Sequence, residues 1–298
     1  MLSFRPKEKT VPELMNYLQA GIAPRPIAFA STIDRNGIPN LSPFSFFNIF
    51  GSNPPLLIFS PARRVRDNTI KHTLENVYEV PEVVVNVVNF AMVQQVSLSS
   101  TEYGKGVNEF EKAGFTPIPS LTVKPFRVKE SPMQLECRVK QIMETGTEGG
   151  AGNLIICEID MIHVSEDVLD EKGQINQHKI DLVARLGGNW YSRATGAALF
   201  EVAKPLTTLG IGVDALPEEI RLSRVLTGND LGRLGNVEKL PDEEALKEFM
   251  QSGRAGEICV ELGFSPGEMG TRRHEMAHLL LEKERTEDAW KVLLSMTA

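Results

Sequence analysis

Before about residue 200, apolar and polar positions alternate over short runs, which is typical of β-strands. Between these runs the spacing predicts only brief helices, over Asn68–Val77 with Asp67 as N-cap and over Ala91–Leu98. Brief helices do not suit parallel strands joined by crossovers, so the pattern favours an antiparallel barrel. Strands are expected over Ile27–Ile33, Ile38–Asn48, Leu56–Ser60, Val83–Asn89, Met133–Met143 and Leu154–Val164.

From Pro205 onward the chain is rich in Leu, Glu and Ala at helical spacing. A Gly-rich stretch, Leu209–Asn236, has no periodicity that assigns it to a helix or a strand. We therefore predict a β-rich domain over residues 1–204 and a mostly helical extension of unknown role over residues 205–298. Helices are expected over Glu218–Leu226, Asp242–Gln251, Glu268–Lys283 and Glu287–Met296.

The segment RPIAFASTIDRNGIPNLSPFSFFN, residues 25–48, predicts a β-hairpin. Asn36 and Gly37 form its turn, because this pair tolerates the positive φ that a tight hairpin requires. The first strand is expected to place one face in a core and to line the other face with small residues. The second strand carries Asn and Ser side chains beside phenylalanines, a surface that suits a flat heteroaromatic ligand. The alternative is that these hydroxyl side chains simply face solvent.

The composition narrows the classes of partner. The chain has 298 residues and a net charge of −7, which argues against a nucleic-acid partner or an anionic membrane surface, since both need a broad basic face. No apolar run is long enough to span a membrane, and no apolar signal region is expected near the N-terminus. Three cysteines without CxxC spacing favour a reducing, cytoplasmic setting over disulfides or a structural zinc cluster.

A basic loop ends the strand LLIFS. Arg63, Arg64 and Arg66 lie within four residues, just where a helix is expected to begin. Guanidinium groups and the free N–H groups of a helix N-terminus together favour phosphate. The loop is therefore a candidate phosphate site, and the alternative is a solvated basic turn.

A family resemblance follows from motifs that occur in order between about residues 20 and 200. They are RPIAFAST, NLSPFSFFN, NPPLLIFSP, RDNT, VVVNVVN, YGKGVNEFEKAGFT and RLGGNWY. In these motifs the chain resembles the flavin-reductase-like, FMN-binding split-barrel flavoproteins, in the branch that includes flavoredoxin-type proteins. The resemblance implies an antiparallel Greek-key split barrel. Together with the short helices and the helical C-terminal extension predicted above, this gives a mainly β (α+β) fold. The resemblance also implies a homodimer with FMN near the subunit interface.

The resemblance assigns cofactor-binding residues by position. The positions that contact flavin in this family hold Ser31, Thr32, Asn40, Ser42, Phe44 and Ser45. Arg66, Asn68 and Thr69 match the phosphate loop, although that loop more often reads Lys-Asp-Thr. Arg185, Gly188 and Tyr191 match a late segment expected near the cofactor.

The implied reaction is hydride transfer from NAD(P)H, a transient donor, to tightly bound FMN, followed by electron delivery to flavin or another acceptor that the sequence does not identify. The cofactor carries this chemistry, so no acid–base or nucleophilic set is needed and none is assigned. A GxGxxG dinucleotide fingerprint is missing from the sequence. The alternative is a non-catalytic FMN-binding electron carrier or sensor.

A second motif, HEMAH at residues 274–278, satisfies the HExxH pattern of zinc metalloproteases. A third ligand is poorly placed, because the extended pattern wants Gly and His where this chain has Leu281 and Glu284. The other interpretation is an amphipathic helix on which Met276, Leu279 and Leu280 face a core. We predict no metal ligands here, and the metalloprotease stays a remote alternative.

Overall fold

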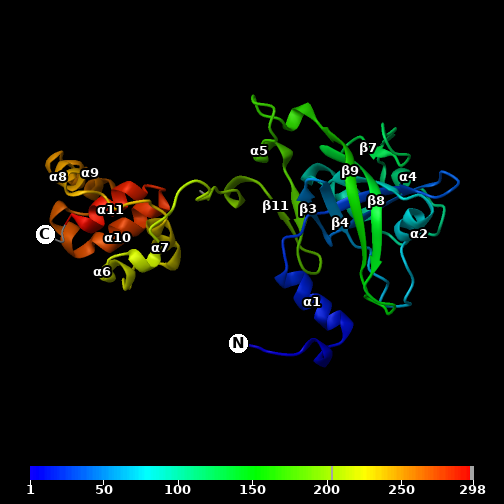
Figure 1. Ribbon diagram of the computed structural model, residues 1–298, viewed down its shortest axis with the longest axis horizontal. Coiled ribbons are helices and arrows are strands. Elements are labelled where there is room, and N and C mark those ends of the chain that lie inside the picture. The colour runs from blue at the N-terminus through cyan, green and yellow to red at the C-terminus, as the bar shows by residue number, and fades with distance from the viewer. Residues whose placement is uncertain (203, 296–298) are drawn as a thin grey trace. The chain divides into compact units, whose positions relative to one another are not determined.

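The computed structural model describes residues 1–202 and 204–295 and divides the chain into two compact units, Met1–Phe200 and Glu201–Ala298 (Figure 1). The first unit contains the sheets, and the second is helical. Among the described residues, no helix combines the length and the apolar character that crossing a bilayer requires.

The first unit is built on a seven-stranded sheet in which every neighbouring pair of strands is antiparallel. In spatial order the strands are β2 (Pro39–Phe44), β1 (Ala28–Ile33), β5 (Glu82–Val87), β8 (Met133–Glu144), β9 (Asn153–Val164), β4 (Pro55–Phe59) and β3 (Phe47–Ser52). Two small hairpins accompany this sheet, β6 (Pro117–Ile118) with β7 (Arg127–Val128) and β10 (Val183–Arg185) with β11 (Tyr191–Arg193).

The sheet has to curl because its two edge strands, β2 and β3, are consecutive in the chain. Only Ser45 and Phe46 separate them. A flat sheet of this size would hold its edges about 29 Å apart, whereas a link this short spans at most about 11 Å. The result is an antiparallel barrel that is split between β2 and β3, as predicted.

Helices and apolar side chains cover both faces of the sheet. Inside the barrel, Ala28 and Ala30 of β1 pack with Phe59 and with Leu74 of helix α2. On the outer face, Phe29 packs against residues from α3 and α4. The helices of this unit are α1 (Val11–Gly21), α2 (His72–Glu79), α3 (Val93–Leu98), α4 (Glu109–Ala113) and α5 (Gln177–Ile180).

Three local predictions for the first unit need correction, and in the second unit the helix expected over Glu218–Leu226 ends at Arg221. The expected strand Ile38–Asn48 is two strands, since the chain turns the barrel corner at Ser45. Helix α2 begins at His72 instead of Asn68, because Asn68 has a φ of 57°, which is incompatible with a right-handed helix. The small residues of β1 line the packed barrel interior and form no open wall, because both faces of this central strand are buried.

The second unit is a bundle of short helices around its own apolar core. They are α6 (Glu218–Arg221), α7 (Gly228–Gly235), α8 (Glu243–Gln251), α9 (Arg254–Glu261), α10 (Met269–Glu282) and α11 (Thr286–Leu294). Trp290 of α11 is buried and donates from its indole N–H to the carbonyl of Leu234, 3.2 Å away. Asp242 is the N-cap of α8 and accepts from the backbone N–H of Ala245. The predicted end of the last helix, Met296, lies outside the described residues.

Candidate functional site

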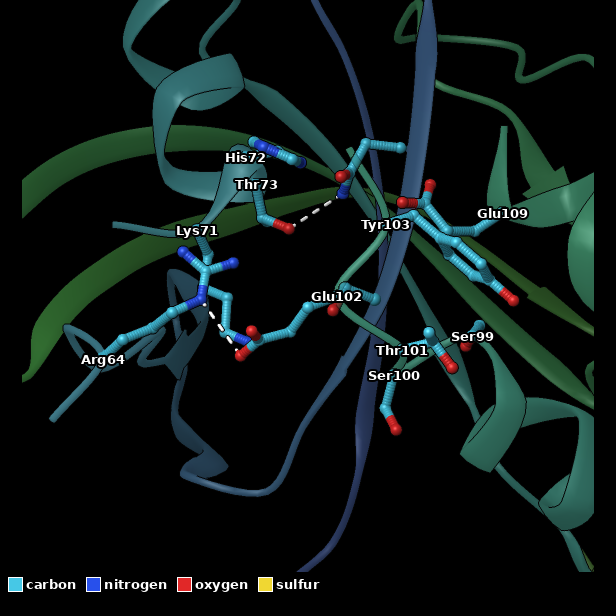
Figure 2. Close-up of a pocket in the computed structure, with 12 residues that line it drawn as sticks. Arg64, Lys71, His72, Thr73, Ser99, Ser100, Thr101, Glu102, Tyr103 and Glu109 are labelled. Atoms are coloured by element: carbon cyan, nitrogen blue, oxygen red, sulfur yellow. Dashed lines mark hydrogen bonds and ion pairs between the residues drawn. The ribbon is translucent and has the colours of Figure 1, made fainter. Parts of the chain in front are cut away.

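A polar hollow of about 320 Å³ lies in the first unit where α2 begins (Figure 2). Strand β2, the basic loop, the first turn of α2 and the loop between α3 and α4 all contribute side chains to it. The lining consists of Asn40, Ser42, Arg64, Lys71, His72, Thr73, Ser99, Ser100, Thr101, Glu102, Tyr103 and Glu109.

Cations and hydroxyls gather at the N-terminus of α2. Lys71 is the N-cap, and no side chain caps the first turn. The hydroxyl of Thr73 accepts from Asn40 Nδ2 at 2.9 Å, which ties the helix to β2. Burial and the nearby Arg64 guanidinium lower the pKa of Lys71. This end of the hollow suits an anion, because the helix dipole and two basic side chains converge there.

The Arg64 guanidinium is held in place by fixed groups. Its Nη1 donates to the hydroxyl of Thr69 at 2.8 Å and to the carbonyl of Ile70 at 2.7 Å. Its Nε donates to the carboxylate of Glu102 at 3.1 Å. The side chain is only 16% exposed, so it is positioned before any ligand arrives.

The loop that follows α3 forms the opposite wall. The hydroxyls of Ser99, Ser100 and Thr101 each donate to a carbonyl three residues earlier. Each of these oxygens can still accept a hydrogen bond. Tyr103 adds an aromatic ring to the lining (Figure 2).

Glu109 is a buried carboxylate that lines the hollow. Its Oε2 accepts from the backbone N–H of Leu41 at 3.0 Å. Burial raises its pKa, and the hydrogen bond from Leu41 opposes that effect in part. It is the buried acidic group of the site.

A second hollow of about 260 Å³ shares Asn40 and His72 with the first. Lys105 and Val107, from the same loop as Tyr103, are among its lining residues. Burial lowers the pKa of His72, the ring that lies between the two hollows. The loop between α3 and α4 therefore contributes side chains to both hollows.

Two of the residues expected to contact flavin, Asn40 and Ser42, line the hollow. Three others are buried elsewhere. Thr32 accepts from Asn76 Nδ2 at 3.1 Å, and Phe44 packs on Phe59 with ring centroids 5.5 Å apart. Ser31 is buried, and its hydroxyl has no hydrogen-bond partner among the described residues. Ser45 is half-buried at the corner between β2 and β3, outside the lining.

The structure does not bring the expected phosphate residues Arg66, Asn68 and Thr69 into the lining of the hollow. Arg66 is 71% exposed and pairs with Asp67 and Glu102. Asn68 accepts from Arg63 Nε at 2.7 Å, and the hydroxyl of Thr69 accepts from Arg64 Nη1.

Asp67 organises this loop from within. The hydroxyl and the backbone N–H of Thr69 donate to its carboxylate, which lowers the pKa of Asp67 to about 2. The loop is thus a hydrogen-bonded support for Arg64.

The late segment lies on the β10–β11 hairpin, outside the lining of either hollow. The Arg185 guanidinium lies over the ring of Tyr191, 4.5 Å from its centroid, and donates to the carbonyl of Gly188 at 2.7 Å. The backbone of Arg185 also pairs with Arg25, in the segment before β1.

Most of the residues that line the hollow were not among those predicted from the sequence. Lys71, His72 and Thr73 carried a usable signal, because they match the Lys-Asp-Thr form of the phosphate loop more closely than residues 66–69 do. No comparable signal marked Ser99–Tyr103, which reaches the hollow only through the folding of the barrel.

The HEMAH side chains on α10 are occupied by neighbours in the second unit. The rings of His274 and His278 bond through Nδ1 to Ser223 Oγ at 2.8 Å and to Asp230 Oδ2 at 2.9 Å. Glu275 pairs with Arg272. Across residues 1–202 and 204–295, no three acidic, His or Cys side chains gather as a metal site would require.

Comparison with known proteins gives matches to the first unit. Residues 20–182 match the family described as flavin reductase like domain. An uncharacterized protein of Aquifex aeolicus is 36% identical over 201 residues, which are 67% of this chain and 100% of that protein.

Two solved structures share the fold. Nitrilotriacetate monooxygenase component B from Bacillus cereus is 30% identical with a TM-score of 0.63, and the match covers 68% of this chain and 98% of that one. Pseudomonas fluorescens 2-nitrobenzoate 2-nitroreductase is 26% identical with a TM-score of 0.61, over 70% of this chain and 100% of that one.

Proposed function

The chain belongs to the flavin reductase like domain family, and on that premise we propose that it is a flavin-dependent oxidoreductase that binds FMN in the polar hollow of its first unit. The monooxygenase component and the nitroreductase that it resembles support redox chemistry of this class. The physiological electron acceptor is not assigned.

The observation that carries the proposal is the donor set where α2 begins. A phosphate monoester needs positive charge, hydroxyl donors and free backbone N–H groups. Arg64, Lys71 and Thr73 supply the first two, and the first turn of α2, which has no side-chain cap, supplies the third. These residues fit the phosphate of FMN.

The ring of FMN is proposed to lie along β2, from Asn40 and Ser42 toward Ser45. The pyrimidine edge of the ring needs small donors and acceptors, which these side chains offer. The lining of the hollow is polar apart from the ring of Tyr103, and Phe44 packs in the barrel core, so most of the apolar cover for the flavin ring has to come from another surface.

We propose that a second copy of the chain supplies this cover, as a homodimer. Strand β3, which begins just after Ser45, exposes Ile49 and Phe50 by 69% and 64%. Adjacent apolar side chains that are this exposed on an edge strand mark an interaction surface.

When bound, FMN would accept a hydride from NADH or NADPH and pass electrons to free flavin or another acceptor. The residues of the chain hold and orient the phosphate and the ring, and none has to act as a nucleophile. A carrier that binds FMN without accepting hydride is the alternative, because the same donor set would serve it equally.

We also propose that residues 1–204 form the flavin domain and that residues 205–298 form an appended helical domain. A reducing, cytoplasmic location is proposed on the three cysteines, which are all free and buried. The zinc metalloprotease is not favoured, since both His rings and Glu275 of HEMAH are engaged within the second unit.

The test is the visible absorption spectrum of the full chain after incubation with FMN and removal of the excess, followed by anaerobic NADH or NADPH. Flavin bands that bleach with either nucleotide would support a reductase. Bands that persist with both would favour the carrier. If no flavin is retained and fluorescence titration also detects no binding, the proposal is wrong.

A further inference from the structure

Glu102 lies where a ligand phosphate would meet Arg64. Its Oε1 is 3.1 Å from Arg64 Nε, and its Oε2 is 2.7 Å from Arg66 Nη2. It lines the hollow together with Lys71 and Thr73, and Figure 2 shows its ion pair with Arg64 inside the site. A carboxylate of the chain thus occupies the cationic centre of the hollow.

A phosphate bound in the hollow and this carboxylate compete for the guanidinium group of Arg64. Like charges that share a small, partly buried site repel each other, and the repulsion is several times stronger there than in bulk water. Phosphate binding therefore has to displace Glu102 or tolerate its charge. Either outcome costs binding free energy that a neutral side chain would not cost.

The Glu102 side chain is placed so that it can leave. It is 44% exposed, and it belongs to the connection between α3 and α4. Gly104 and Gly106 follow it, and Gly106 has a φ of 87°, a backbone conformation that only glycine adopts freely. Arg64 would stay in place when Glu102 moves, because Thr69 and Ile70 hold it independently.

We propose that Glu102 is an affinity-determining residue that competes with the flavin phosphate for Arg64 and thereby weakens the binding of FMN. This inference rests on the proposed function of the hollow.

The experiment compares the full-length wild type with Glu102→Gln, which keeps the shape of the side chain and removes its charge. Dissociation constants for FMN and for riboflavin, which has no phosphate, are measured by flavin fluorescence, and FMN release is followed by stopped flow. Glu111→Gln is the matched control, because Glu111 is exposed on α4, contacts Asn108 and lies outside the lining.

We expect Glu102→Gln to bind FMN about tenfold more tightly or better, with slower release, and to bind riboflavin as the wild type does. Glu111→Gln should match the wild type for both ligands.

Three results would overturn the inference. Unchanged or weaker FMN binding by Glu102→Gln, while the wild type binds FMN, would exclude competition and leave the proposed function standing. Equal tightening for riboflavin would show that Glu102 acts on another part of the flavin. Failure of all three proteins to bind FMN would remove the proposed function and this inference with it.

Discussion

At the scale of single residues, the polar groups of the site hold one another in place. Asn40 is bonded to Thr73, and Arg64 is bonded to Thr69, Ile70 and Glu102. Among the described residues, the ammonium group of Lys71 makes no hydrogen bond or ion pair, although the charges of Arg64 and Glu102 both act on it. A bound phosphate would therefore change the interactions of Lys71 more than those of Arg64.

Lys71→Met is expected to weaken FMN binding roughly 10- to 100-fold, since a hydrogen bond to a charged group contributes about 1.5–3 kcal/mol. Riboflavin binding should change little, because it has no phosphate. Fluorescence titration measures both. Lys140→Met is the control, since Lys140 pairs with Glu158 on the β8–β9 hairpin, away from the hollow. Equal losses in the two variants would contradict the assignment of Lys71.

Glu136 makes the stability of the first unit depend on pH. Burial alone would raise its pKa, but hydrogen bonds from the amides of Leu121 and Thr122, the Thr122 hydroxyl and His163 lower it to about 2. A carboxylate with a lowered pKa stabilises the fold above its unfolded-state pKa, and this contribution is lost as the pH falls from about 4.5 toward 2.

Over this pH range the free energy of unfolding is expected to fall by at most about 3 kcal/mol. The fall should be smaller in Glu136→Gln, because glutamine does not titrate. Thermal unfolding of both proteins between pH 2 and pH 7 checks this. The wild type should be the more stable at pH 7, and the difference should shrink as the pH falls. A constant difference across this range would show that Glu136 does not titrate as described.

At the scale of elements, the edge strand β2 is closed against further pairing. Leu41 donates its N–H to Glu109 instead of to a neighbouring strand. Residues two positions away point to the same edge, and these are Pro39 and Pro43, which have no N–H. A strand beside a ligand site thereby offers no free donors to another chain.

Glu109→Ala is expected to destabilise the first unit by about 1–3 kcal/mol, because the buried N–H of Leu41 loses its acceptor. Glu109→Gln should cost less, since its amide oxygen can still accept. Amide hydrogen exchange at Leu41 should be faster in Glu109→Ala than in the wild type. Unchanged exchange would mean that another group protects this amide.

The HEMAH motif on helix α10 contributes side chains to the core of the second unit. Met276 and Ala277 are buried in the core of the second unit, and Glu275 pairs with Arg272 on the surface. Glu275→Gln is therefore expected to leave the rate of flavin reduction unchanged, measured by anaerobic stopped flow. A large loss would connect this helix with the redox site.

At the scale of the whole molecule, each unit has its own apolar core. The clusters around the barrel draw only on residues before Phe200, and the helical cluster draws only on residues after Glu201. A cluster that is complete within one segment is what independent folding requires.

Truncation after residue 204 is therefore expected to leave FMN affinity and dimerisation intact. Fluorescence titration and analytical ultracentrifugation of the truncated and full-length proteins check this. Collapse of the barrel on truncation would show that the extension contributes to its stability, and a selective loss of dimerisation would place part of the interface in the extension.

The residue pattern was enough to predict most of the strands and helices. Alternation located the strands, since the burial of successive side chains is a local property, and Asp242 was recognised as the start of α8 for a similarly local reason. Family motifs then predicted the barrel and a set of site residues that includes Asn40 and Ser42, both of which line the hollow. The corner at Ser45 escaped prediction, because the bend of a sheet depends on which strands pair at its ends.

Which side chains meet depends on how the chain folds. Asn40 bonds Thr73 across 33 residues, and Arg64 bonds Glu102 across 38. No periodicity encodes such pairs, because they follow from the curling of the sheet and the packing of α2 and α4 against it. For the same physical reason, only the folded chain shows that Arg64, Lys71 and Thr73 line the hollow, and that Glu102 pairs with Arg64 there.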